Sequence, residues 1–206
     1  MTCFILAGGF GTRLAHLTYR IPKPLIKTGN KKAIDYIISN LQFNGVFNIL
    51  VNIHYMPLPI VEYLRDSVKY FASTKLMGTA GEVLKAKDYL FRKIMKVEDS
   101  FIVHNGDTIT NVDIYKMLLS HNVSKAIVTI FTKDDAIHSG GIYIFRKEIF
   151  NYIPKNKVYF IHTDLIPKLI RKKIPINLYK SDAYYFDIGT PQGLKNARSY
   201  FKSKTN

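Results

Sequence analysis

The chain contains no tryptophan, one cysteine and half as many acidic as basic residues. Cys3 has no partner for a disulfide within the chain, which fits a reducing compartment. No apolar run approaches the roughly 18 to 20 residues that a membrane-spanning helix needs. The apolar stretch Thr2–Ala7 is also too short for a signal peptide. We therefore expect a cytoplasmic protein without membrane insertion.

The formal net charge of +15 raises the question of an anionic partner. Lysine supplies 23 of the 30 basic residues, and these are scattered apart from the short runs Lys31–Lys32 and Arg171–Lys173. We favour a solvated lysine-rich surface over attraction of anionic substrates or membranes. We expect no nucleic-acid partner.

The 206 residues contain no internal repeat, low-complexity tract or Gly/Ser-rich linker, so we expect a single domain over residues 1–206. Short β-branched runs alternate with amphipathic stretches, which is typical of an α/β fold with a mostly parallel sheet. Ligands of such sheets bind beyond the carboxyl ends of the strands. The expected strands are Cys3–Ala7, Asn48–Ile53, Ser100–Val103, Ala126–Phe131, Gly141–Phe145 and Ile176–Leu178. The expected helices are Lys32–Asn44, Pro59–Val68, Gly81–Arg92, Asp113–His121, Lys147–Tyr152, Thr163–Lys172 and Pro191–Phe201.

Two of these helices have an apolar stripe that predicts a core-facing side. The first stripe consists of Ile34, Ile37, Ile38 and Leu41, and the second of Leu165, Ile166, Leu169 and Ile170. Gly45 supplies a stop signal after the first of these helices.

A glycine-rich segment, Leu6–Leu14, directly follows the first expected strand. Its three glycines allow a tight turn that presents backbone N–H groups to phosphate oxygens. Arg13 adds a permanent cation with fork geometry. The segment matches neither the dinucleotide fingerprint G-x-G-x-x-G nor the Walker P-loop. Lys23 follows between Pro22 and Pro24, which stiffen the backbone around it. Taken alone, Lys23 is also compatible with a surface lysine in a turn.

Two aspartates follow hydrophobic runs in positions that suit a metal ion. Asp107 comes after the expected strand Ser100–Val103, and Asp187 comes after the aromatic run Tyr184–Phe186. Mg²⁺ prefers oxygen ligands, commonly one or two carboxylates together with substrate phosphates. The alternatives are a turn residue for Asp107 and a helix-start signal for Asp187, with Thr190 as the cap and Pro191 as the first helical residue. From these residues alone both readings stay open.

The motifs Gly-Gly-x-Gly-Thr-Arg-Leu and Pro-Lys-Pro-Leu at this spacing resemble those of the sugar-1-phosphate nucleotidyltransferase family. This family contains guanylyl-, uridylyl- and thymidylyltransferases. The likeness continues at Val51–His54, Leu76–Gly81, Asn105–Thr108, Ser139–Tyr143 and Asp187–Pro191. It implies a Rossmann-like three-layer α/β/α fold with a mostly parallel mixed sheet, with a nucleotide-binding half at about 1–110 and a sugar-binding half at about 111–206.

The resemblance also implies a role for each matching residue. Arg13 and Lys23 would be catalytic, and Asp107 and Asp187 would hold Mg²⁺. The residues implied for nucleotide binding are Leu6, Ala7, Gly8, Gly9, Gly11, Thr12, Gly78, Thr79 and Gly81. Those implied for sugar binding are Asn105, Gly106, Gly140 and Gly141.

The implied reaction joins a sugar-1-phosphate to a nucleoside triphosphate, giving a nucleotide-sugar and pyrophosphate. GTP is favoured and UTP is next. The chain departs from the family pattern on the sugar side, because the Glu-Lys-Pro segment of many relatives is absent and His162–Asp164 stands where Glu-Lys-Asp is frequent. Lys133, Asp134 and Asp135 lie in the shortened connection as possible substitutes.

Two alternatives stay open at this point. One is a nucleotidyltransferase for a non-sugar phosphorylated acceptor, and the other is a catalytically degraded nucleotide-binding subunit. The 27 Tyr and Phe residues also make a homodimer plausible.

Overall fold

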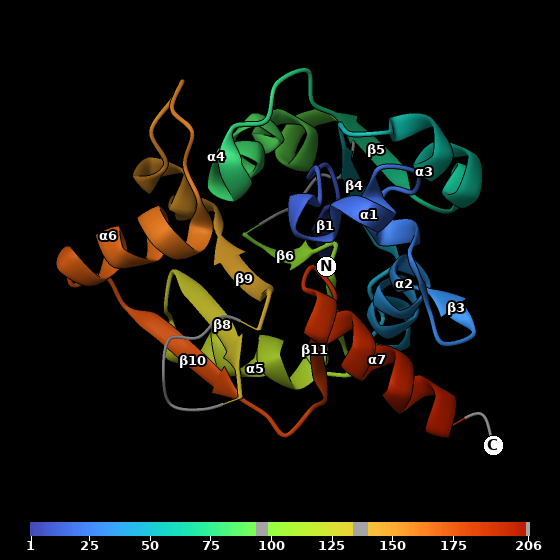
Figure 1. Ribbon diagram of the computed structural model, residues 1–206. Helices are drawn as coiled ribbons and strands as arrows, with labels where there is room; N and C mark the ends of the chain where they lie inside the picture. The colour runs from blue at the N-terminus through green and yellow to red at the C-terminus, as the bar shows by residue number, and fades with distance from the viewer. Residues whose placement is uncertain (94–98, 134–139, 205–206) are drawn as a thin grey trace.

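The structure is a computed structural model that describes residues 1–93, 99–133 and 140–204 (Figure 1). The strands are β1 (Thr2–Leu6), β2 (Lys27–Thr28), β3 (Lys31–Lys32), β4 (Asn48–Ile53), β5 (Lys69–Ala72), β6 (Ser100–Asn105), β7 (Thr108–Thr110), β8 (Val128–Thr132), β9 (Ile142–Arg146), β10 (Ile176–Lys180) and β11 (Tyr185–Asp187). The α-helices are α1 (Ala15–Thr18), α2 (Ala33–Phe43), α3 (Pro57–Leu64), α4 (Gly78–Lys85), α5 (Ile114–Ser124), α6 (Ile166–Arg171) and α7 (Pro191–Ser203).

Seven strands form the central sheet in the order β10-β8-β9-β6-β1-β4-β5. The pairs β1–β4, β1–β6, β4–β5 and β8–β10 are parallel, whereas β9 runs antiparallel to both β6 and β8. The expected mostly parallel mixed sheet is therefore confirmed. The carboxyl ends of β1 and β6 meet at the same edge, because Leu6 is paired with Asn105.

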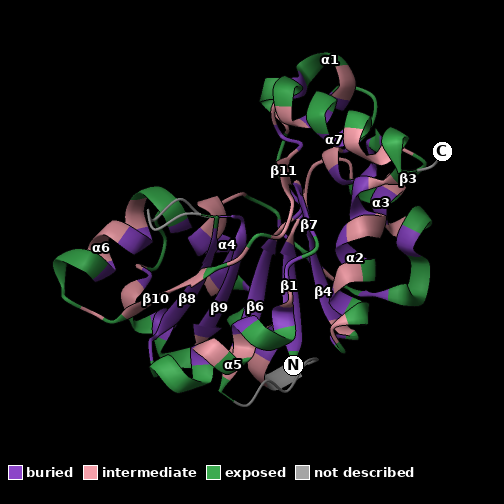
Figure 2. Cartoon of the chain, turned by 90° about the horizontal axis from the view of Figure 1, so that it is seen from below, coloured by how far each residue is buried: buried purple, intermediate pink, exposed green. Residues whose placement is uncertain are grey.

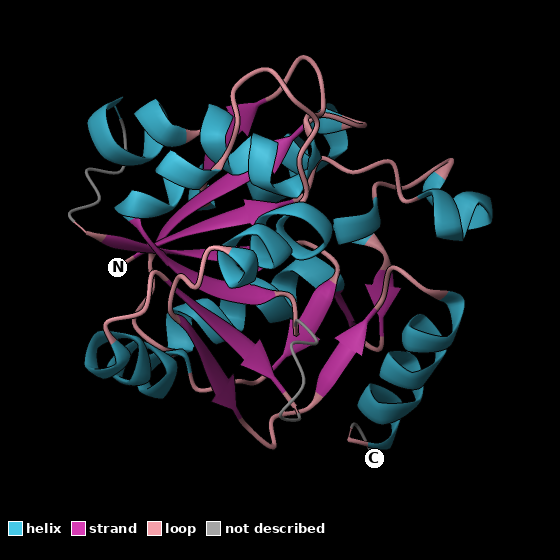
Figure 3. Cartoon of the chain, turned by 90° about the vertical axis from the view of Figure 1, so that its left-hand side faces the viewer, coloured by secondary structure: helices cyan, strands magenta, loops and turns pink. Residues whose placement is uncertain are grey.

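Helices cover both faces of this sheet, which gives the expected three layers (Figure 3). Neighbouring residues of β1 point to opposite faces: Phe4 packs in a cluster with side chains of α4 and α6, and Ile5 packs in a cluster with side chains of α2, α3 and α5. The inner strands β1, β4, β6, β8 and β9 are almost entirely buried (Figure 2), whereas the edge strands β5 and β10 are partly exposed. This double burial explains why the strands read as continuous apolar runs in the sequence.

The predicted helical stripes fit the core with one exception. Ile34, Ile37, Ile38 and Leu41 of α2 are buried, and Gly45 ends this segment with a positive φ of 76°. Leu165, Ile166 and Leu169 are also buried. Ile170 is 47% exposed, so its assignment to the core stripe was wrong. Segment Lys147–Tyr152, expected as an α-helix, is a 3-10 helix.

A short antiparallel ribbon of β7 and β11 was not expected from the sequence, whereas α7, which follows it, was expected over Pro191–Phe201. The register of the ribbon pairs Asp187 with Thr108. Ile109, Ile188 and Leu194 anchor the ribbon and α7 in a third apolar cluster. Thr190 accepts a hydrogen bond from the N–H of Gly193, which confirms the predicted cap of α7. The ribbon thus attaches the last part of the chain to the carboxyl edge of the sheet.

Among the helices that the structure describes, none combines the length and the apolar character needed to cross a bilayer. This finding agrees with the lack of long apolar runs in the sequence.

Buried His121 is expected to make the stability of the protein depend on pH. Its Nδ1 and Nε2 lie 2.8 Å from Thr129 Oγ1 and 3.3 Å from Ser100 Oγ. Burial, reinforced by Arg146, lowers the pKa of His121 from 6.5 to about 4. In the unfolded chain the His121 imidazole therefore binds a proton below pH 6.5, whereas in the folded chain it stays neutral down to about pH 4. We expect the free energy of unfolding to fall by up to about 3 kcal/mol across this window.

Urea unfolding at pH 7.0, 5.5 and 4.5 tests this expectation. His104, which is buried and has a pKa lowered to about 4, contributes in the same direction. In His121→Asn the slope of unfolding free energy against pH should therefore be roughly halved rather than abolished. An unchanged slope would show that His121 is not held neutral.

Candidate active site

The larger of two adjoining cavities lies at the carboxyl end of β1 and has a volume of about 620 Å³. It is lined by Leu6, Ala7, Gly8, Gly9, Phe10, Gly11, Thr12, Arg13, Lys23, Pro24, Asn52, Leu76, Gly78, Thr79, Glu82, Asn105, Gly106, Asp107, Val158 and Phe160. Every residue predicted for nucleotide binding is among them except Gly81. Gly81 instead makes a backbone contact, because its N–H donates to the carbonyl of Tyr159 at 3.0 Å.

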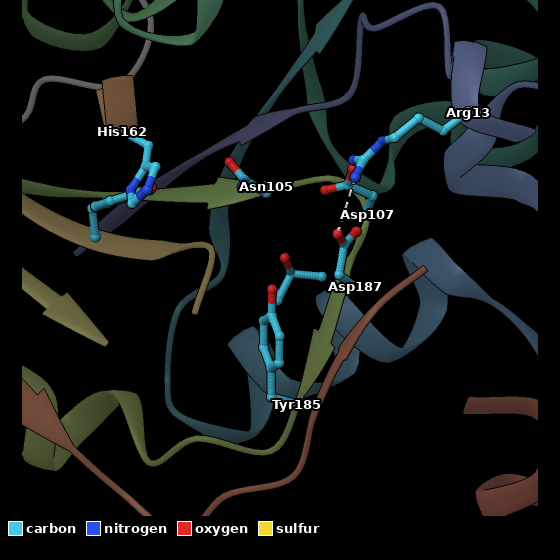
Figure 4. Close-up of a pocket in the computed structure, with 8 residues that line it drawn as sticks. Arg13, Asn105, Asp107, His162, Tyr185 and Asp187 are labelled. Carbon is cyan, nitrogen blue, oxygen red and sulfur yellow. Dashed lines mark ion pairs between the residues drawn. The ribbon is translucent and has the colours of Figure 1, made fainter. Parts of the chain in front are cut away.

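The smaller cavity has a volume of about 270 Å³ and is lined mainly by polar side chains. Its residues are Arg13, Asn105, Asp107, Thr108, Tyr143, His162, Tyr185 and Asp187. Figure 4 shows His162 on one side of this space and the two aspartates on the other. Arg13, Asn105 and Asp107 line both cavities, so the two spaces meet at these three residues.

The two predicted metal ligands come together through the β7–β11 ribbon. Asp107 immediately precedes β7, and Asp187 is the last residue of β11. A Cβ atom at Gly189 would lie 2.8 Å from Asp107 Oδ2 and 2.8 Å from Asp187 Oδ1. Both carboxylates therefore border one small space. The sequence placed both aspartates at strand ends, and the ribbon that joins them is a feature of the tertiary structure.

These two carboxylates are a suitable protein contribution to a Mg²⁺ site. Mg²⁺ keeps several waters and commonly takes one or two carboxylates together with substrate phosphates. Among the described residues, no group of three or more His, Cys, Asp or Glu side chains could enclose a metal ion. The donor set thus fits an ion that shares its coordination with a substrate, rather than one held by the protein alone.

Both predicted catalytic cations are paired with these aspartates. Lys23 Nζ lies 2.6 Å from Asp107 Oδ2, and both side chains are 16% exposed. Pro22, in extended conformation, leads into the 3-10 turn Lys23–Leu25 and fixes the start of the lysine side chain. Arg13 NH1 lies 3.6 Å from Asp187 Oδ2, and its side chain is 59% exposed (Figure 4). Lys23 is therefore the more enclosed cation, and Arg13 lies closer to the solvent.

Replacing Gly189 by alanine is expected to disrupt this arrangement. The added methyl would be 2.8 Å from an oxygen of each aspartate and 2.9 Å from Arg13 NH2, closer than real Cβ contacts permit. We expect turnover to fall about tenfold or more, because catalytic groups tolerate little displacement. Gly45→Ala is the control for turnover: its Cβ would meet nothing within 4 Å, and the strain of alanine at a φ of 76° can lower stability without reaching the site. Equal turnover in the two variants would contradict this geometry.

The residues predicted for sugar binding are divided by the structure. Asn105 lines both cavities, and Gly106 lines the larger one. Gly140 and Gly141 are among the lining residues of neither cavity. Gly141 instead accepts the N–H of Asn105 at 2.8 Å, and a Cβ there would collide with Thr108. A direct role for these two glycines in sugar binding stays a prediction.

The shortened connection gives no replacement for the missing Glu-Lys-Pro segment within the described residues. Lys133 is exposed and lines neither cavity. Asp134, Asp135 and Ser139 lie outside the described residues.

Several cavity-lining residues were not predicted as site residues, and the polar ones with longer side chains are Asn52, Glu82, Tyr143, His162 and Tyr185. His162 stands in the segment where relatives have Glu-Lys-Asp, which was the available signal. Tyr185 lies two positions before Asp187 and so faces the same side of β11. Burial, followed by the charges of Asp187 and Asp107, raises the pKa of Tyr185 to about 12. Its hydroxyl therefore keeps its proton and can donate to a ligand in the smaller cavity.

Comparison with known proteins agrees with this arrangement. The model of the nucleotidyl transferase family matches residues 2–140. A UTP–glucose-1-phosphate uridylyltransferase of Synechocystis sp. is 27% identical over 92% of this chain, and the chain spans 60% of that relative's length. A D-glycero-alpha-D-manno-heptose 1-phosphate guanylyltransferase of Aneurinibacillus thermoaerophilus is 29% identical over 96% of this chain and 97% of its own length.

A solved structure is similar over nearly the whole fold. The crystal structure of HddC from Yersinia pseudotuberculosis complexed with GMP-PN has a TM-score of 0.79 and 25% identity. The match covers 98% of this chain and 99% of that chain. From its motifs, the geometry of its site and the span that the family model matches, the chain belongs to the nucleotidyl transferase family.

Proposed function

We propose that the protein joins a sugar-1-phosphate to GTP and releases pyrophosphate. The observation that carries this proposal is the meeting of the two cavities at Arg13, Asn105 and Asp107. A nucleoside triphosphate in the larger cavity and a phosphorylated acceptor in the smaller one would bring their phosphates together there. Both predicted catalytic cations and both predicted metal ligands border this junction.

The reaction is an in-line attack of an acceptor phosphate oxygen on the α-phosphorus of the triphosphate. A phosphate oxygen is nucleophilic near neutral pH, so alignment and charge neutralisation are the main tasks of the protein. Backbone N–H groups of the glycine-rich loop would hold the phosphates. Lys23 would contact the reacting phosphates, and Arg13 would compensate the charge that grows on the departing pyrophosphate.

Asp107 and Asp187 would hold Mg²⁺ beside the phosphates. When bound there, the ion would supply Lewis-acid stabilisation of phosphate charge. The pairing of each aspartate with a cation keeps both carboxylates oriented toward the space beside Gly189. Lys23 and Arg13 are then placed to contact phosphate oxygens once a ligand occupies the junction.

The choice of GTP is supported by the relatives that match this chain over their full length. The heptose-1-phosphate guanylyltransferase has nearly the length of this chain, whereas the uridylyltransferase is considerably longer. The similar solved structure contains GMP-PN. We therefore propose a heptose- or hexose-1-phosphate as the acceptor, with UTP as the next nucleotide to consider.

The polar lining of the smaller cavity suits a hydroxyl-rich acceptor. Asn105, Thr108, Tyr143, His162 and Tyr185 provide an amide, three hydroxyls and an imidazole. Such groups can exchange hydrogen bonds with sugar hydroxyls. This lining supports a sugar over a small non-sugar acceptor.

Pyrophosphate release with Mg²⁺ tests the proposal, using four nucleoside triphosphates against mannose-, glucose-, N-acetylglucosamine- and heptose-1-phosphate and against an amino-alcohol phosphate. We expect turnover with GTP and one of the sugar phosphates. Turnover only with an amino-alcohol phosphate would replace the sugar in the proposal. Binding of a triphosphate without turnover on any acceptor would support the regulatory subunit instead.

A cytoplasmic location and a homodimer stay predictions, and light scattering of the purified chain tests the dimer.

A further inference from the structure

Two buried polar side chains lie together in the wall of the larger cavity, and the proposed mechanism does not use them. Glu82 is only 3% exposed and Asn52 only 1%, and both line the cavity. Glu82 belongs to α4, which packs over the sheet near β1 and β4 (Figure 1), and Asn52 belongs to β4. They line the larger cavity together with the glycine-rich loop and Gly78–Thr79, and neither is among the residues that the two cavities share.

The hydrogen bonds of Glu82 divide its two oxygens between two tasks. Oε1 accepts the N–H of Met77 at 2.9 Å and the ammonium of Lys85 at 3.3 Å, which ties α4 to the preceding loop. Oε2 accepts the amide of Asn52 at 3.0 Å. A carboxylate oxygen can accept two hydrogen bonds. Oε2 therefore has the capacity to accept one more donor.

Asn52 supplies a second acceptor beside it. Because its amide nitrogen donates to Glu82, its Oδ1 is directed elsewhere. A Cβ atom at Gly8 would lie 2.7 Å from this Oδ1. The oxygen thus lies against the glycine-rich loop, within the wall of the same cavity.

We propose that Glu82 and Asn52 select guanine as the base of the nucleotide. The inference rests on the proposed nucleotidyl transfer and names the residues that determine its nucleotide. Guanine presents two adjacent donors on one edge, N1–H and the 2-amino group. Glu82 Oε2 and Asn52 Oδ1 are two neighbouring acceptors that match this edge.

The other bases fit this pair of acceptors less well. Uracil presents one N–H between two carbonyl oxygens, so an acceptor oxygen of the protein would face an acceptor of the base. Cytosine and adenine each present an amino group beside an unprotonated ring nitrogen. For all three, one protein acceptor would be left facing a lone pair in a buried place, which disfavours binding. Selectivity then comes from this mismatch as well as from the contacts to guanine.

Comparison of GTP with inosine 5′-triphosphate (ITP) isolates the contact of the 2-amino group, which we assign to Glu82 Oε2, because ITP differs only by lacking that group. In the wild type we expect kcat/KM for GTP to exceed that for ITP by about 10- to 100-fold. In Glu82→Gln the ratio should fall to about threefold or less, since an uncharged amide of the same shape replaces the carboxylate. Asn52→Ser should lower kcat/KM for GTP relative to kcat/KM for UTP and leave the hydrogen bonds of Glu82 Oε1 intact.

Lys85→Met is the matched control for a role of Glu82 that is only structural. It removes the ammonium from Oε1 and from Ser73 but leaves Oε2 in place. We expect it to change kcat/KM for GTP and ITP by the same factor. An unchanged GTP-to-ITP ratio in Glu82→Gln, in a protein with native circular dichroism, would overturn the inference.

The failure of this inference is distinguishable from failure of the proposed function. A wild type that transfers nucleotides but prefers UTP or CTP would refute guanine selection and leave the transfer reaction standing. If no triphosphate is turned over, calorimetric binding of GDP and inosine 5′-diphosphate to the wild type and Glu82→Gln measures the same ratio. The same ratio of GDP to inosine 5′-diphosphate affinity in both proteins would refute the inference. A preference for GDP that is present in the wild type and absent in Glu82→Gln would support it.

Discussion

Lys23→Ala is expected to lower kcat by about 10²- to 10³-fold while the protein stays folded. The ammonium of Lys23 lines the larger cavity and is only 16% exposed, so its charge acts on a bound phosphate with little screening by water. A preorganised cation of this kind contributes most where charge develops in the transition state. Steady-state pyrophosphate release, with a thermal melt to verify folding, measures the effect.

Lys147→Ala is the matched control for this prediction. Lys147 also makes a 2.7 Å ion pair with an aspartate, Asp99, but both side chains are largely exposed and neither lines either of the two cavities of the site. We expect wild-type turnover in this variant, because an exposed ion pair contributes little. Near-native turnover in Lys23→Ala as well would refute the catalytic role of Lys23.

Arg13→Ala should reduce turnover similarly, and Arg13→Lys should restore only part of it. The guanidinium offers a planar fork that can bind two phosphate oxygens at once, whereas an ammonium is a point charge. Because Arg13 is 59% exposed and lines both cavities, it is placed to follow a departing pyrophosphate toward the solvent.

Most of the central sheet could be predicted from the sequence because its inner strands are buried on both faces. The edge strand β5, with one buried residue, was not predicted. β4 was predicted with its observed bounds, and β1, β6, β8, β9 and β10 with ends shifted by at most two residues. In contrast, β7 and β11 have three residues each and exist because they pair with one another across a long sequence separation. Local apolar pattern carries no signal for such pairing.

The same distinction applies to the site. Residues in a continuous motif, such as the glycine-rich loop, Lys23 and the aspartates, could be named from the sequence because the motif itself fixes their place. Glu82 could not be named, because α4 also turns small and apolar side chains toward the interior and a carboxylate among them gives no sequence pattern. Tyr143 and His162 meet in the smaller cavity only through the fold.

Replacing either aspartate of the β7–β11 ribbon is expected to weaken both catalysis and the response to Mg²⁺. In Asp187→Asn we expect kcat to fall about 10²- to 10³-fold and half-activation to need at least about tenfold more Mg²⁺, because one of two protein carboxylates is lost. Asp107→Asn should have at least as large an effect, since it also leaves Lys23 without its partner at 2.6 Å. Titration of pyrophosphate release with Mg²⁺ gives both quantities.

The double variant tests whether the two aspartates bind the same ion. If both carboxylates bind one ion, losing the second should add little to losing the first. The kcat of Asp107→Asn/Asp187→Asn should therefore lie within about threefold of the kcat of the slower single variant. Asp113→Asn applies the same substitution to the cap of α5, where Oδ1 accepts the N–H of Lys116. It can affect stability but should leave the Mg²⁺ titration unchanged. Multiplicative losses of kcat in the double variant would mean that the two aspartates act independently. This result would contradict the proposal that both bind one ion.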